Sequence, residues 1–337
     1  MGFKRLDAED FVVSADSVQS TAWSTGLATL TSFHTSSVQA GSTSGNFYLS
    51  VYQDNVITSS ATVQFDITYG NVNGLGSEYY NGAVPSLTPS RTVYGQYRTL
   101  VLEDENTNFS YGTDNNVFTP NDFWALSVER ARYKEKLFPG TFNITLSGSG
   151  GLLNLTDNSN DVTHQTFIGS NRVLQIVSGS NGSAITANSG YAPGSGSYGL
   201  FLPDIGTILL NPAAISESIN LVPNRTANLT NGTNQATLYT AISGGGAFQL
   251  NAQETITSDY IFVRSRNSEF NYSENPSFIS GSTGEVIYEQ FINNPQVYIT
   301  TVGMYNDANE LIAVAKMSKP LLKDFTKESL VRVKLDF

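Results

Sequence analysis

Residues 297–317, VYITTVGMYNDANELIAVAKM, decide the fold class of this 337-residue chain. Two runs rich in β-branched and other apolar residues, Val297 to Tyr305 and Glu310 to Met317, flank the polar tetrapeptide Asn306 to Asn309. This pattern predicts two antiparallel strands joined by a short turn, and the turn fixes which residues face each other. The stretch therefore predicts a β-hairpin.

Similar alternations extend the β pattern toward both ends of the chain. Phe47 to Val51 and Thr62 to Tyr69 alternate apolar and polar residues, and Val331 to Phe337 does the same up to the last position. Turn-forming Gly, Asn and Ser recur between such runs at a spacing of roughly 8–12 residues, which is typical of all-β proteins. We expect the final run to be a strand paired in a sheet.

The remaining segments add one long strand and a few short helices. Arg91 to Leu102 reads as a long strand with a glycine bulge. Asn211 and Pro212 supply a cap and a first-turn proline for a short helix through Ser216. Pro320 to Leu330 fits a short amphipathic helix.

These elements predict a mainly β protein with two or three β-sandwich-like domains and a few short helices. We place an N-terminal β-rich domain at 1–110 and a central one at 111–240, which contains long loops of Gly, Ser and Asn. The C-terminal β-rich domain spans 241–337, with hairpin 297–317 and the terminal strand.

The composition excludes several kinds of chemistry. The chain has no Cys and two His, His34 and His164, so a thiolate site or a histidine-based catalytic or metal site is not expected. Its 18 Lys and Arg against 29 Asp and Glu give a net charge of −11, which argues against nucleic acid as a partner. No apolar run approaches the ~20 residues of a membrane span, and residues 1–10 lack the pattern of a signal peptide. We expect no cofactor, metal or small-molecule ligand.

Two acidic patterns are candidate sites. Asp157 to Asp161 places oxygen ligands at alternating positions, as a calcium loop does, but lacks the glycine and glutamate of such loops, which favours a solvated turn. A glycan hydrolase needs two carboxylates that face one cleft, and no spacing selects a pair from the acidic residues Asp54, Asp66, Glu103, Asp104 and Glu105. The sequence therefore predicts no catalytic residues.

Partner contacts are predicted at two kinds of residue. Glu129 to Lys136 holds four basic and two acidic residues, which indicates a helical turn that is either a solvated face or a docking element for an acidic neighbour. The candidate contacts are the basic residues Arg130, Arg132 and Lys134, and the aromatic residues Trp23, Trp124, Tyr305 and Phe337. The two Trp residues fit either the core or an interface.

The C-terminal block Asn294 to Phe337 resembles that of virion structural proteins of T4-like contractile-tailed phages, particularly those of cyanobacteria. Its phrase VGMYNDANELIAVAK is similar to adaptor segments of phage tail-fibre and baseplate proteins. Further similar stretches are TAWSTGLATLTSFHTSS at 21–37, VYGQYRTLVLEDEN at 93–106 and ERARYKEKLFPGTFNITLSG at 129–148. The resemblance implies a non-enzymatic virion component, present in multiple copies, that joins other virion proteins in the baseplate or the neck of the tail.

The main alternative is a receptor- or carbohydrate-binding module on the virion surface, with loop tyrosines that stack on sugars. Its candidate residues are Tyr79, Tyr80, Tyr191 and Tyr198. Such a module ends in a tip that faces solvent, whereas a connector has partners at both ends.

Overall fold

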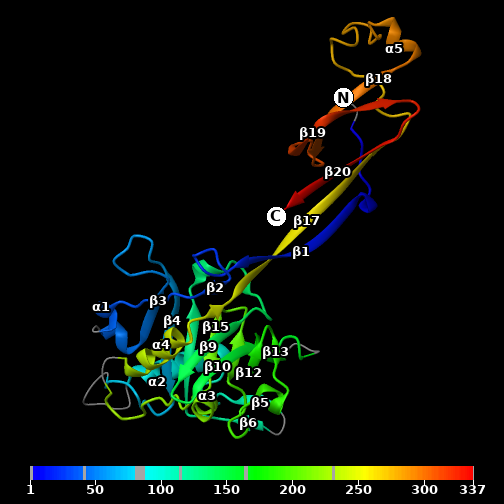
Figure 1. Ribbon diagram of the computed structural model, residues 1–337. Helices are drawn as coiled ribbons and strands as arrows, with labels where there is room; N and C mark the ends of the chain where they lie inside the picture. Colours follow the sequence, from blue (N-terminus) through cyan, green and yellow to red (C-terminus); the bar gives the residue numbers. More distant parts are fainter. Residues whose placement is uncertain are drawn as a thin grey trace. The chain divides into compact units, whose positions relative to one another are not determined.

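The computed structural model describes residues 3–40, 43–79, 88–113, 116–162, 166–229 and 232–336, and it divides the chain into two compact units (Figure 1). Unit 1 combines Met1–Ser17 with Thr255–Phe337, and unit 2 is Val18–Glu254. The protein is mainly β, with 42% of its residues in strands and 18% in helices, which confirms the predicted fold class.

Unit 2 is built on one large curled sheet, which has twelve strands within the described residues. Its order is β2 (Thr29–Leu30), β16 (Phe248–Gln249), β9 (Asn143–Gly148), β10 (Gly151–Asp157), β12 (Asn171–Ser180), β14 (Gly199–Leu202), β15 (Thr207–Leu210), β7 (Asp122–Val128), β4 (Val63–Asn71) and β3 (Tyr48–Tyr52). The short strands β11 (Thr166–Ile168) and β13 (Ser183–Ala184) also pair with β12. The strands predicted at 47–51 and 62–69 correspond to β3 and β4.

The central strands β14, β15 and β7 are buried on both faces of the sheet, and β7 shows why. Its side chains alternate, so that Trp124, Leu126 and Val128 belong to one core cluster while Phe123 and Ala125 belong to another. Helices α3 (Pro212–Ile219) and α4 (Thr233–Gly245) cover the first cluster, and α2 (Pro89–Leu102) covers the second. A strand that is apolar on both faces must be covered on both.

The segment 91–102, predicted as a strand, is instead most of helix α2. Pro89 occupies the first turn, where its missing N–H costs nothing. Val93, Tyr97 and Val101 recur every four residues, and Val93 and Val101 are fully buried on the sheet. Their β-branched and aromatic character favours a strand locally, but burial of one helical stripe outweighs that preference.

The helix predicted after Asn211 is confirmed as α3. The Asn211 side chain accepts a hydrogen bond from the backbone N–H of Ala213 (3.1 Å), and Pro212 is the first helical residue. The other short elements of unit 2 are α1 (Ser37–Ala40), η2 (Thr43–Asn46), η3 (Arg130–Arg132), η4 (Ala187–Gly190), the β5–β6 pair (Tyr111–Thr113, Asn116–Phe118) and β8 (Lys136–Leu137), which pairs with β17.

Unit 1 contains two small sheets. In the first, β17 (Asn251–Ser265) lies between β1 (Phe11–Thr21) and β20 (Ser329–Asp336) (Figure 1). Residues 18–21 of β1 and 251–254 of β17 are assigned to unit 2. The second is the hairpin of β18 (Gln296–Tyr305) and β19 (Leu311–Asp324). The remaining helices are η1 (Ala8–Asp10) and α5 (Glu289–Asn293). The hairpin predicted at 297–317 and the terminal strand are both confirmed, the latter paired antiparallel with β17 from Ser258↔Asp336 to Ser265↔Ser329.

The prediction of an amphipathic helix at 320–330 is wrong, because β19 continues to Asp324 and β20 starts at Ser329. Lys323 anchors this end of β19. Its buried ammonium group donates hydrogen bonds to the carbonyl oxygens of Asn267 (3.2 Å) and Asp324 (3.0 Å) and to Oδ1 of Asn271 (2.7 Å). These bonds hold the 267–271 segment against the strand.

The three consecutive domains predicted at 1–110, 111–240 and 241–337 do not correspond to the observed units. Strand β4 from the first range pairs with β7 from the second, and β16 from the third range pairs with β9. Hydrogen bonding therefore merges parts of all three ranges into one sheet, while the two ends of the chain together form unit 1.

Candidate functional site

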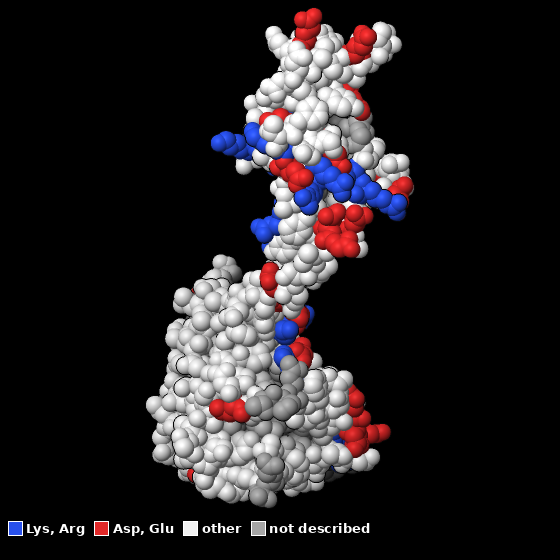
Figure 2. Space-filling view, turned by 90° about the vertical axis from the view of Figure 1, so that its right-hand side faces the viewer, with Lys and Arg blue, Asp and Glu red and all other residues white. Residues whose placement is uncertain are grey.

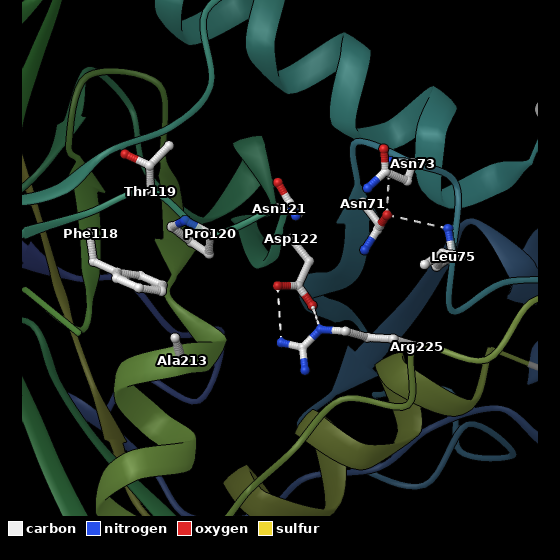
Figure 3. A pocket seen from close by; sticks show the side chains of 10 residues that line it. All are labelled: Asn71, Asn73, Leu75, Phe118, Thr119, Pro120, Asn121, Asp122, Ala213 and Arg225. Carbon is white, nitrogen blue, oxygen red and sulfur yellow. Dashed lines mark hydrogen bonds and ion pairs between the residues drawn. The ribbon is translucent and has the colours of Figure 1, made fainter. Parts of the chain in front are cut away.

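A shallow pocket of about 270 Å³ lies in unit 2, where β4 ends and β7 begins (Figure 3). It is lined by Asn71, Asn73, Leu75, Phe118, Thr119, Pro120, Asn121, Asp122, Ala213 and Arg225. The pairing Asn71↔Asp122 places these two side chains at the same end of neighbouring strands.

The centre of the pocket is an ion pair with one buried partner. The Asp122 side chain is 2% exposed, and it accepts hydrogen bonds from Nε (2.8 Å) and Nη2 (3.1 Å) of Arg225. Tyr69 donates its hydroxyl to the same carboxylate (2.8 Å). Burial works against the charged guanidinium, but Asp122 outweighs it and raises the pKa of Arg225. Burial, and then the charge of Asp122, raise the pKa of Tyr69.

A second polar network fixes the segments around this pair. The buried Asn234 side chain donates to the carbonyl oxygens of Gly76 (3.0 Å) and Asn224 (2.8 Å) and accepts from the N–H of Asn224 (2.8 Å). The Trp124 indole donates to the carbonyl oxygen of Asn234 (2.9 Å). Together the networks join the segments before α2, before α4 and at the start of β7.

The polar groups of this site bind one another, so their contacts stabilise the fold of unit 2. Both carboxylate oxygens of Asp122 already accept hydrogen bonds, and Arg225 directs two donors at Asp122 instead of at the pocket. Among the described residues, no group of three or more His, Asp or Glu side chains is arranged to hold a metal ion. In the 157–161 loop, whose pattern resembles a calcium loop, the Asp157 carboxylate accepts hydrogen bonds from the N–H groups of Gly140 and Ser159.

The structure places Trp23 and Trp124 in the core, which corrects their assignment as partner contacts. Their side chains are 2% and 0% exposed. The Trp23 indole donates to the carbonyl oxygen of Phe248 (2.9 Å), and its ring packs edge-on against that of Phe248. Both residues therefore belong to the core of unit 2, and a partner protein cannot contact their rings while the chain is folded.

The predicted helical turn at 129–136 is a single 3₁₀ turn, η3, followed by β8. Arg130 stacks over the Tyr133 ring at 4.5 Å and donates to the carbonyl oxygens of Tyr133 and Lys134. Lys134 pairs with Glu254 (2.8 Å). The Nε of Arg132 is buried and has no hydrogen-bond partner among the described residues. Most of the local positive charge is thus directed to groups of the same unit.

The other sequence candidates are spread over both units. Tyr305 ends β18 and packs edge-on against Phe3, with ring centroids 5.2 Å apart. Of the loop tyrosines, Tyr79 and Tyr191 are half-buried and Tyr198 is buried. Backbone hydrogen bonds join His34 to Tyr52. Phe337, His164 and Tyr80 lie outside the described residues.

The feature that the sequence analysis missed is the apolar surface of unit 1. Of the described apolar residues that are buried, 47 lie in unit 2 and only Ile261 and Val333 in unit 1. Unit 1 holds less than a third of the chain but sixteen of the 28 exposed large apolar side chains. These are Phe3, Phe11, Val12, Val13, Phe270, Tyr272, Ile287, Tyr288, Ile292, Tyr298, Tyr305, Leu311, Ile312, Val314, Phe325 and Leu330.

A signal for this surface was present in the sequence. The run ELIAVAKM places apolar residues at successive positions, so both faces of the strand are apolar, yet a hairpin has no second sheet to cover them.

Comparison with known protein families, curated proteins and solved structures returned no match for the chain. No helix in the described parts of the chain is long and apolar enough to cross a membrane.

Proposed function

We propose that the chain is a structural subunit of a tailed-phage virion that joins neighbouring proteins in the baseplate or the neck of the tail. Unit 1 makes the contacts and unit 2 serves as the rigid body. The sequence resemblance supports the virion context. The different roles of the two units are supported by their contrast in apolar burial, since unit 2 buries its apolar side chains and unit 1 exposes many of its own.

The observation that carries the proposal is the missing core of unit 1. A domain of this size normally buries one contiguous apolar core, and an isolated two-stranded hairpin is at best marginally stable in water. The hairpin β18–β19 leaves Leu311, Ile312 and Val314 more than half exposed. Exposed apolar surface of this extent is typical of a protein–protein contact.

Unit 2 has the opposite character. The central strands of its sheet are covered on both faces. Aromatic rings pack in its core, for example Phe142 against Phe201 and Phe65 against Phe248, with centroids 5.4 and 5.3 Å apart. Its face in Figure 2 is largely free of charged side chains. A close-packed body of this kind suits a permanent position in a particle.

The test is a truncation that removes Val331 to the C-terminus, in cells that assemble the phage particle. The truncation deletes six of the eight β17–β20 residue pairs and the buried Val333, so we expect the shortened protein to be absent from purified particles. A matched control changes the exposed Glu105 of unit 2 to Lys and should be incorporated normally. Normal incorporation of the truncated chain, measured by mass spectrometry of particles, would contradict the proposal.

A further inference from the structure

The sheet β1–β17–β20 of unit 1 ends in two open edges. Within the described residues no other strand pairs with the outer side of β1 or of β20. An unpaired edge presents a row of N–H and C=O groups that can pair with a strand of another chain.

The β1 edge lacks the proline and the basic residues that protect many natural edges. From Phe11 to Asp16 it contains no proline and no Lys or Arg, and all of its residues except Ser14 are exposed. Phe11 is 48%, Val12 48% and Val13 69% exposed, so that apolar side chains project from both faces. Edge strands that do not associate are usually short, bulged, or carry Lys or Pro.

The two edges differ in charge. The β1 side carries Asp7, Glu9, Asp10 and Asp16, with no Lys or Arg between residues 6 and 21. The charged residues of β20 are Arg332, Lys334 and Asp336, a net charge of +1. Arg332 lies over the Tyr260 ring at 5.4 Å, and Lys334 contacts Asp336 at 2.9 Å. Ten of the chain's eighteen Lys and Arg residues belong to unit 1, and Figure 2 shows several of them gathered there.

We propose that copies of this chain associate head to tail through unit 1, with β1 of one copy paired to β20 of the next. This inference deepens the proposed function, on which it rests, by naming the partner of unit 1 as a second copy of the chain. Acidic β1 against basic β20 is electrostatically complementary, whereas β1 against β1 would bring eight acidic groups together without a basic one between them.

Such a contact is heterologous, because two different surfaces of the same unit meet. Repetition of a heterologous contact produces a closed ring when its rotation closes, and an open filament when it does not. It would also give the exposed Phe11, Val12 and Val13 cross-strand neighbours on β20 of the next copy. A ring of three or more identical subunits needs a contact of this type.

The experiment uses the full-length chain and two edge variants, whose mass is measured by light scattering after size-exclusion chromatography over a range of concentrations. Variant A carries Val12→Lys and Val13→Lys on β1, and variant B carries Leu330→Glu and Arg332→Glu on β20. All four positions are exposed. We expect the unchanged chain to associate, each variant alone to be monomeric, and an equimolar mixture of A and B to associate again.

The mixture is decisive because each variant keeps one intact edge, and the new lysines and glutamates are also complementary. Association of variant B by itself would indicate β1–β1 pairing and overturn the proposal, as would a monomeric unchanged chain. Leu152→Glu, at an exposed position of unit 2, is the control and should associate like the unchanged chain. The fluorescence of Trp23 and Trp124 reports that unit 2 is folded, and circular dichroism reports the strands. If the unchanged chain is monomeric but enters particles, this inference fails while the proposed function stands.

Discussion

The ion pair in the unit 2 pocket allows a quantitative test of its structural role. Arg225→Ala removes both guanidinium donors and leaves the Asp122 carboxylate, which is 2% exposed, with the hydrogen bond from the Tyr69 hydroxyl. Truncation of one member of a fully buried pair costs about 3–5 kcal/mol. Arg225 is itself 42% exposed, so water screens part of the attraction. We therefore expect the free energy of unfolding of unit 2 to fall by about 2–3 kcal/mol.

The assay is urea unfolding followed by tryptophan fluorescence. The chain has only two Trp residues, and both lie in the core of unit 2, so the signal reports this unit. For a unit of this size, 1 kcal/mol corresponds to a change in Tm of about 2–4 °C, so Arg225→Ala should lower Tm by roughly 4–12 °C.

The matched control is Lys134→Ala. It removes an ion pair with Glu254 in which the Lys134 side chain is 79% exposed. We expect that change to cost less than about 1 kcal/mol. In the double variant Asp122→Asn/Arg225→Ala, the buried charge is absent, so the two effects should fall short of additivity by about 1–2 kcal/mol. If Arg225→Ala is no more destabilising than Lys134→Ala, the ion pair does not stabilise unit 2 and the pocket is free for another role.

Two further predictions concern unit 2. Burial, and then the charge of Glu129, raise the pKa of Asp66 above its ordinary value, so this carboxyl favours folding most below about pH 4 and less as the pH rises. The variant Asp66→Asn should therefore gain stability relative to the unchanged chain between pH 4 and 7. A difference in thermal unfolding that does not depend on pH would contradict this. The Asn211 side chain caps α3, and its amide also donates hydrogen bonds to the carbonyl oxygens of Ser195 (2.7 Å) and Ser197 (2.8 Å). We therefore expect Asn211→Ala to lower the free energy of unfolding in urea by about 2–4 kcal/mol. The variant Asn211→Asp keeps the cap acceptor but not the amide donors, and full stability of that variant would show that the two carbonyl contacts do not matter.

The sequence alone predicted several local elements correctly, and for a shared reason. The hairpin at 297–317, the strands at 47–51 and 62–69, and the cap at Asn211 all depend on interactions between residues close together in the chain. Period-two alternation, turn residues and a capping side chain act within a few residues of one another, so they can be read without knowledge of the rest of the fold.

Segments whose conformation depends on distant partners were predicted less well. The stretch 91–102 contains strand-forming residues, but its helical stripe is stabilised by the outer face of β7, which contributes Phe123 and Ala125. The stretch 320–330 has an amphipathic pattern, but the end of β19 is fixed by contacts of Lys323 with the 267–271 segment. In both cases burial against residues far along the chain outweighs local preference.

The candidate sites divide in the same way. Composition by itself determined that the chain has no cysteine, two histidines and few charges, and hence what chemistry it lacks. Only the tertiary structure decided that Trp23 and Trp124 are internal, that Asp122 and Arg225 meet across 103 positions, and that unit 1 is made from both ends of the chain. Residue types are fixed by the sequence, but whether a side chain is covered depends on which distant strands pair, and that pairing is cooperative over the whole sheet.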